Sequence, residues 1–187
     1  MRKIIAVVGL CGTGKSAAVH LLQQDLAAPI VYFGGVVLGE LERRGLEVNS
    51  ANERTIREQL RREHGMAAIA ITAQPEIASA LTQSPVVIID GLYSFAEYER
   101  LKESYGADLY LIAIHSSRQL RYARMAQRKV RPLTPQEVDS RDLAEIKHLD
   151  KGGPIAIADY HVINESSLND LSARLGPIVL NIADAVR

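Results

Sequence analysis

The stretch that decides the fold is Gly9-Leu10-Cys11-Gly12-Thr13-Gly14-Lys15-Ser16, which has the G-x-x-x-x-G-K-S spacing of a phosphate-binding loop. Glycines let the backbone turn tightly, and a helix that starts at the loop directs its positive end at the bound anion. The lysine adds a charge for the β- and γ-phosphates of a nucleotide, and the serine hydroxyl can bind Mg²⁺. The predicted phosphate-binding residues are Gly9, Leu10, Cys11, Gly12, Thr13, Gly14, Lys15, Ser16 and Ala17.

The sequence on either side of the loop fits a strand–loop–helix unit. Residues 2–8 form a short run rich in β-branched side chains, which is typical of a buried parallel strand. Beyond the loop, Ala18, Val19, Leu22 and Leu26 recur at helical spacing. The alternative is a glycine turn between two core elements, but motif and context together favour phosphate binding.

Strand-like and helical patterns alternate along the rest of the chain. This alternation predicts an α/β, three-layer P-loop NTPase fold, with a parallel sheet, helices on both faces and a small helical lid. We expect the strands at 29–33, 85–91, 109–115 and 160–164, and the helices at 36–44, 50–65, 66–82, 95–104, 116–131, 135–149 and 167–175. Pro75 is expected to kink or divide its helix, and Gly176-Pro177 to break the last one before a final helical segment. Ligands of such folds bind at the carboxyl ends of the strands.

A second diagnostic stretch is Val86-Val87-Ile88-Ile89-Asp90-Gly91. It predicts a doubly buried strand with an acid at its end. In a P-loop fold an acid at that place binds Mg²⁺ directly or through water, so Ser16 and Asp90 are the predicted metal ligands. The alternative is an ordinary Asp-Gly turn between strand and helix.

The composition sets the protein class. A chain of 187 residues is expected to form one domain, residues 1–187, and its zero net charge provides no general attraction to nucleic acid or to membranes. No apolar run reaches the length of a membrane span, so we expect no membrane partner. The one cysteine, Cys11, cannot form an internal disulfide, which suits a cytoplasmic protein. We interpret it as a small residue in the loop rather than as a redox group.

A stripe of arginines follows the fourth predicted strand, with no acid among its members. Their spacing places them on one helical face, where like charges repel, so something anionic should offset them. Triphosphate is the simplest candidate, because arginines stabilise charge on a transferring phosphoryl group. Thr134 can cap a second helix, and the two helices would form a lid at about residues 118–149. An RNA-binding surface is the alternative, although only Tyr122 adds an aromatic ring. The stripe comprises Arg118, Arg121, Arg124, Arg128 and Arg131, together with Lys129.

At this point the sequence resembles the P-loop kinases of the dephospho-CoA kinase and nucleoside monophosphate kinase group, and an uncharacterised branch of it most of all. The resemblance rests on 9–16, 87–91, Arg121 with Arg124, 140–142 and 158–168. It implies transfer of the γ-phosphoryl group of ATP, with Mg²⁺, to a small phosphate-bearing acceptor. It further implies that Arg121 and Asn164 contact ATP. Catalysis would use Lys15 and Asp90 together with three arginines of the lid, Arg124, Arg128 and Arg131.

The sequence departs from the family pattern on the acceptor side, which we expect to comprise helices within residues 34–83. Gly35 and Leu38 stand where the pattern has an acid and an arginine, and Tyr93 stands where an arginine is expected. Either the acceptor differs, or the protein binds or slowly hydrolyses ATP as a nucleotide-sensing module. Two acids of the next helix could replace the missing base or could be surface charges, and the same ambiguity applies to four arginines. These residues are Glu40 and Glu42, and Arg43, Arg44, Arg54 and Arg57.

Overall fold

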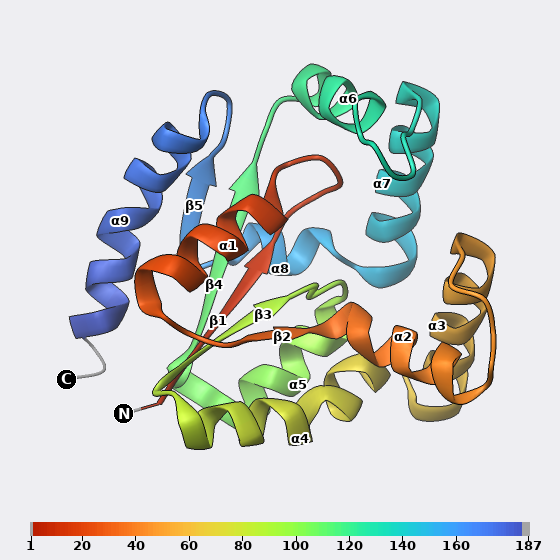
Figure 1. Cartoon of the computed structure of the whole chain (residues 1–187), viewed down its shortest axis with the longest axis horizontal. Helices are drawn as coiled ribbons and strands as arrows, with labels where there is room; N and C mark the ends of the chain where they lie inside the picture. Colours follow the sequence, from red (N-terminus) through yellow and green to blue (C-terminus); the bar gives the residue numbers. More distant parts are fainter. Residues whose placement is uncertain (1, 185–187) are drawn as a thin grey trace.

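The fold is organised around one parallel sheet, seen in a computed structural model that describes residues 2–184 (Figure 1). The strand order is β2-β3-β1-β4-β5, and every neighbouring pair is parallel. This arrangement confirms the predicted α/β P-loop fold. The strands are β1 (Lys3–Val8), β2 (Ile30–Tyr32), β3 (Val86–Asp90), β4 (Leu109–His115) and β5 (Tyr160–Ile163).

Helices cover both faces of the sheet, as the alternation of patterns predicted. On one face lie α1 (Lys15–Leu26) and α9 (Leu168–Asp184); on the other lie α2 (Phe33–Arg43), α3 (Ser50–His64), α4 (Ala68–Gln83) and α5 (Phe95–Tyr105). A short 3₁₀ turn, η1 (Gly106–Asp108), precedes β4. The remaining helices are α6 (Arg118–Ala126), α7 (Pro135–Leu149) and α8 (Gly152–Ala156).

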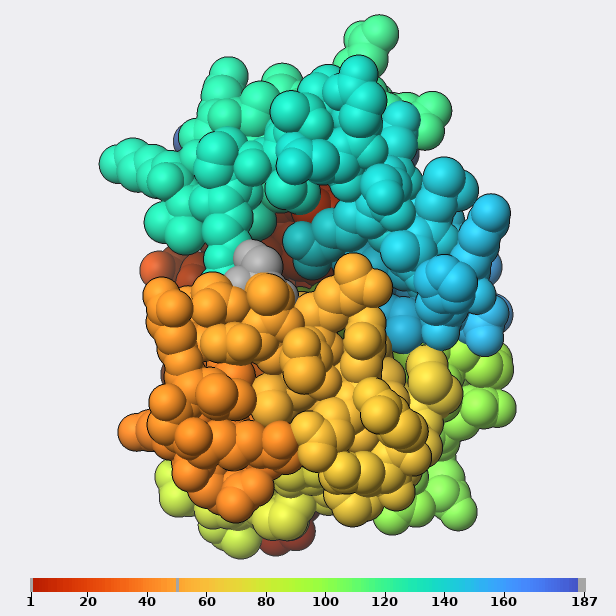
Figure 2. Space-filling view, turned by 90° about the vertical axis from the view of Figure 1, so that its right-hand side faces the viewer, coloured from red at the N-terminus to blue at the C-terminus, as the bar shows by residue number. Residues whose placement is uncertain are grey.

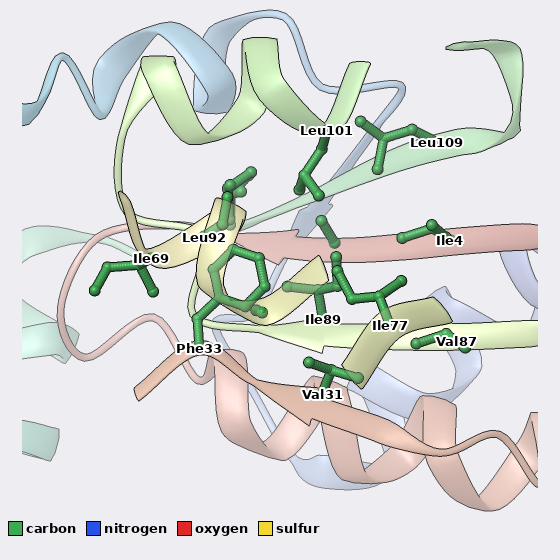
Figure 3. Packing of buried hydrophobic residues seen from close by; sticks show 14 of the residues in the cluster. Ile4, Val31, Phe33, Ile69, Ile77, Val87, Ile89, Leu92, Leu101 and Leu109 are labelled. Atoms are coloured by element: carbon green, nitrogen blue, oxygen red, sulfur yellow. The ribbon is translucent and has the colours of Figure 1, made fainter. Parts of the chain in front are cut away.

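Alternating side chains of the strands feed two cores. In β1, Ile4, Ala6 and Val8 pack toward α2–α5, while Ile5 and Val7 pack toward α1 and α9. Such a strand is apolar on both faces, which is why its sequence is a continuous apolar run. Figure 3 shows the first core, in which the ring of Phe33 lies among buried aliphatic side chains of the sheet and of α4.

Two predicted element boundaries are wrong. Gly34-Gly35 does not end a strand but lies in the first turn of α2, which starts at Phe33, a residue buried in the core. Gly176-Pro177 lies inside a continuous α9. Pro75 does not divide its helix, since it lies inside a continuous α4. An interior proline costs about 3 kcal/mol. Both helices offset this cost by burying an apolar stripe; in α9 it comprises Leu171, Leu175, Ile178, Val179 and Ile182.

The carboxyl ends of the strands face an open region between two helical pairs. In Figure 1 the lid helices α6 and α7 lie on one side of this region, and α2 and α3 lie on the other. The loop between β1 and α1 lies at the same end of the sheet. Within residues 2–184, no helix is both long and apolar enough to cross a membrane.

Candidate functional site

The loop at residues 9–14 has the backbone of an anion cradle. Gly14 has a φ of 94° and immediately precedes α1, with no side chain capping the helix. The first N–H groups of α1 are therefore available to an anion, and the helix dipole favours one there. A methyl group at Gly14 would overlap the amide of Asn164, so the position is closed to other residues for two independent reasons.

Lys15 is held over this loop, and its surroundings disfavour its charge. Its Nζ donates a hydrogen bond to the carbonyl of Leu10 at 2.9 Å. Burial, together with the positive charge of Lys151, lowers the pKa of Lys15 to about 7. A cation in such an environment gains from a phosphate partner.

Asp90 and Ser16 could hold Mg²⁺. Asp90 ends β3 opposite Val7 of β1, so it emerges beside the strand that leads into the loop. Burial raises the pKa of Asp90, while the Lys15 charge opposes that rise. Ser16 is exposed in the first turn of α1. A carboxylate and a hydroxyl are the oxygen ligands that Mg²⁺ takes beside substrate phosphates, so these residues fit the metal.

Asn164 supports the loop from the end of β5. It is only 6% exposed, and its Nδ2 donates to the carbonyl of Thr13 at 2.9 Å. Its backbone N–H donates to His115, and its Oδ1 accepts from Arg124. Arg124 also donates to Ser116 and to Thr13. The structure thus brings together Asn164 and Arg124, two predicted ATP-site residues that are far apart in sequence, at the loop.

Carboxylates from other elements offset much of the arginine stripe. Arg118 pairs with Asp139 at 2.8 Å, and Arg121 pairs with Asp142 at 2.6 Å. Arg121 also donates to the carbonyl of Cys11, so it ties the lid to the loop. The stripe therefore does not depend on triphosphate alone for its counter-charge. These two acids lie on α7, outside the stripe itself.

The single helical face predicted for the stripe is also wrong at its far end. Helix α6 ends at Ala126, so Arg128 lies exposed in the loop that follows. Arg131, in the same loop, reaches Glu53 of α3 at 2.7 Å. This pair joins the lid to the acceptor side of the molecule.

A cavity of about 250 Å³ lies between α2, α3 and the lid loop, and we call it the acceptor pocket. Figure 2 shows the groove between the lid and α2–α3, with atoms of the N-terminal loop at its floor. Its lining includes both apolar side chains and arginines. The pocket is lined by Tyr32, Phe33, Gly34, Val37, Leu38, Val48, Glu53, Arg57, Arg61, Ile69, Tyr93 and Arg131.

Only one of the four arginines considered for an acceptor phosphate lines this pocket. Arg57 does, whereas Arg43 and Arg44 pair with Glu40, and Arg54 pairs with Glu58 on the surface. Neither Glu40 nor Glu42 is among the lining residues. The acid at this pocket is Glu53, which lies 3.6 Å from Arg57 as well as beside Arg131.

Arg61 is a pocket residue that the sequence reasoning missed. Its spacing of four from Arg57 places both on one face of α3, and that spacing was the available signal. Arg61 lies 3.6 Å from the buried Glu97, and its Nε is buried without a hydrogen-bond partner. The other oxygen of Glu97 accepts from the backbone N–H groups of Tyr93 and Ser94. Glu97 thus holds Arg61 in place while a donor of Arg61 remains unused.

Relatives of the chain share its P-loop region and most of its length. A family model described as AAA domain matches residues 5–147. A UPF0200 protein of Thermococcus sibiricus is 34% identical, over 92% of this chain and 91% of its own length. A UPF0200/UPF0201 protein of Archaeoglobus fulgidus is 34% identical over 98% of this chain, which spans 57% of that relative.

Solved structures with the same fold include small-molecule kinases. A protein of Thermus thermophilus, TT1252, superposes with a TM-score of 0.69 at 19% identity, covering 96% of this chain and 97% of its own. A shikimate kinase of Bacteroides thetaiotaomicron gives a TM-score of 0.60 at 14% identity, with coverages of 95% and 98%. A gluconokinase of Sinorhizobium meliloti gives 0.57 at 16% identity, with full coverage of both chains. At these identities the likeness shows the fold alone.

Proposed function

The chain belongs to the UPF0200 family, and we propose that it is an enzyme that uses ATP and Mg²⁺ to phosphorylate a small, phosphate-bearing acceptor. The observation that carries this proposal is the acceptor pocket. Three arginines of α3 and of the lid loop line it, namely Arg57, Arg61 and Arg131. Arginine suits this role because its planar guanidinium group can form two parallel hydrogen bonds with one phosphate group.

The residues of this chain would divide the work as follows. The loop amides and Lys15 would bind the β- and γ-phosphates of ATP, and Arg124 would neutralise charge on the group in transfer. Mg²⁺, held by Ser16 and Asp90, would neutralise phosphate charge. Closure of the lid would exclude water, which otherwise competes as an acceptor. Such a reaction needs little base assistance, so the missing acid at Gly35 is compatible with it.

The acceptor is proposed to resemble dephospho-CoA or a nucleotide. The apolar lining residues Phe33, Val37, Leu38 and Ile69 suit a flat or apolar group, and the arginines of the lining suit a phosphate. A small-molecule acceptor in this pocket is the partner we propose, and the cytoplasm is the compartment.

A second candidate is a nucleotide-sensing module that binds or hydrolyses ATP without phosphorylating an acceptor. The observation that favours it is the pairing of Arg131 with Glu53, which joins the lid loop directly to α3. Gly35 and Leu38 add to it, because they remove the acid and the arginine of the family pattern.

One experiment separates the two candidates. ADP and inorganic phosphate are measured together after incubation with ATP and Mg²⁺, with dephospho-CoA, each nucleoside monophosphate or each nucleoside as the acceptor. Transfer gives ADP with little free phosphate and a phosphorylated acceptor. Equal amounts of ADP and phosphate with every acceptor would reject the kinase and favour the hydrolysing module.

A further inference from the structure

Lys151 is a buried cation outside every residue set that the sequence suggested. The whole residue is 1% exposed, although lysine is seldom buried unless it is paired. It lies between the end of α7 and the start of α8, directly after Asp150, which has a left-handed backbone conformation. Burying a charged lysine at the base of the lid is costly unless nearby groups pair with it.

The partner of Lys151 is Glu145, and Glu145 has a second partner. Lys151 Nζ donates to Glu145 Oε2 at 2.6 Å, and the other carboxylate oxygen, Oε1, accepts from Arg141 Nε at 3.0 Å. The backbone N–H of Lys151 also donates to the carbonyl of Glu145. One carboxylate therefore connects a buried lysine to an arginine whose side chain is 45% exposed.

This cluster lies between the phosphate-binding loop and the acceptor pocket. Lys151 Nζ is 4.7 Å from the centre of the Tyr93 ring, and Tyr93 lines the pocket. On the other side, the charges of Lys151, Glu145 and Arg141 all act on Lys15. Two cations, Arg141 and Lys151, share the carboxylate of Glu145, so the cluster carries one net positive charge, and its charges act on Lys15 of the loop.

We infer that Lys151 and Glu145 are positioning residues that hold the exposed guanidinium of Arg141 toward the phosphoryl group in transfer. The inference rests on the proposed function. A buried ion pair adds little stability over apolar residues of the same size, so stability alone does not account for it. A positioning role explains the pair better, because the pair fixes the orientation of Arg141 before the substrate binds.

The test compares Glu145→Gln and Lys151→Met with Lys147→Met, which removes an exposed lysine from the last turn of the same helix. Loss of a residue that orients a catalytic side chain costs about 10- to 100-fold in activity. We expect that loss in kcat for both variants, with the KM for ATP changed less than about threefold, and no loss in Lys147→Met.

The combination Arg141→Ala with Lys151→Met shows whether Lys151 acts through Arg141. If it does, the double variant is no slower than Arg141→Ala alone, because neighbouring residues in one network are not additive. ATP-dependent protection of the α7 amides from hydrogen exchange provides a readout apart from turnover, and it should weaken in Glu145→Gln. Glu145→Gln keeps the side-chain volume, so it serves as the test if Lys151→Met fails to fold.

Each outcome decides one point. Unchanged kcat in Glu145→Gln and Lys151→Met, or additive losses in the double variant, would overturn the positioning role while the kinase assignment stands. Absence of transfer by the unmodified protein with every acceptor would overturn the proposed function and this inference with it.

Discussion

The proposed donor half and the proposed acceptor half of the site differ in the groups that form them. The donor half combines the contiguous backbone groups of residues 9–14 with the side chains of Lys15, Ser16 and Asp90, at the ends of the adjacent strands β1 and β3. The acceptor half uses side chains of α2, α3 and the lid loop, and its Arg131–Glu53 contact joins residues 78 positions apart. Backbone recognition suits a phosphate on any nucleotide, whereas side chains determine which acceptor fits. The acceptor half is therefore where relatives with one fold can differ in substrate.

The largest effect is expected at Lys15, which belongs to the proposed donor half. Lys15→Ala removes the charge on the nucleotide phosphates, and we expect turnover to fall by roughly 100- to 1,000-fold with every acceptor. ATP binding should weaken as well, because the lysine acts on the donor. Initial rates of ADP formation and a nucleotide-binding titration measure the two effects.

Lys102→Ala provides the matched control, since this lysine is exposed on α5 and lies away from the loop. It should leave both measurements unchanged. Normal ATP affinity and turnover in Lys15→Ala would remove the donor half from the proposed mechanism.

Arg61 tests whether the acceptor half acts separately. Arg61→Ala removes a guanidinium with an unused buried donor from the pocket, and a hydrogen bond to a charged group contributes about 1.5–3 kcal/mol. We expect the acceptor KM to rise by roughly 10- to 100-fold, while the KM for ATP stays within about threefold. Steady-state kinetics with each substrate varied in turn measures the split.

Arg54→Ala is the control, because Arg54 lies on the same helix but pairs with Glu58 outside the pocket. It should change neither KM. An equal rise of both KM values in Arg61→Ala would mean that the two halves are not separable in this way.

Gly14 tests whether the donor half depends on backbone shape. An alanine there would have to adopt a left-handed conformation, at a cost of about 1–2 kcal/mol, and would also meet the Asn164 amide. We expect the free energy of unfolding to fall by at least that amount and ATP binding to weaken. Denaturant unfolding with and without ATP measures both.

Gly39→Ala is the control, because it makes the same substitution at a glycine that does not need a left-handed backbone. Gly39 lies in α2 with open space around a would-be methyl group, so alanine there should stabilise the helix by about 0.5–1 kcal/mol. Loss of stability in Gly39→Ala comparable to that in Gly14→Ala would show that the loop conformation is not special.

Features that depend on neighbours in the chain could be predicted from the sequence, whereas features that depend on contacts between distant elements could not. The strand–loop–helix unit and the Thr134 cap of α7 depend on neighbours in the chain, and both were confirmed. The continuity of α9 through Pro177 depends on burial against α1 and the sheet, which local propensity does not contain. The Arg61–Glu97 and Glu145–Lys151 pairs depend on how helices meet, and a lysine at 151 carries no signal of its own burial. How ATP and the acceptor use these residues remains a prediction.

The smallest expected effect concerns the Arg131–Glu53 pair, where the lid meets the acceptor half. Arg131 is 47% exposed, so the pair contributes only about 0.2–1 kcal/mol. Glu53→Gln should lower the free energy of unfolding by that amount at neutral pH. It should also lower the acceptor KM a few-fold, because a carboxylate no longer competes with the acceptor phosphate for Arg57 and Arg131.

The pH dependence of that difference identifies its cause. The hydrogen bond from Arg131 holds the pKa of Glu53 below its ordinary value of 4.5, so the charged pair stabilises the protein above that value. Its contribution disappears as the pH falls through the lowered pKa. Protonated glutamate and glutamine then carry the same charge, so the two proteins should converge in stability in acid. Glu58→Gln, which affects an exposed pair on the same helix, should leave the acceptor KM unchanged. If the stability difference between Glu53→Gln and the unmodified protein persisted in acid, its cause would be packing and not the charge of Glu53.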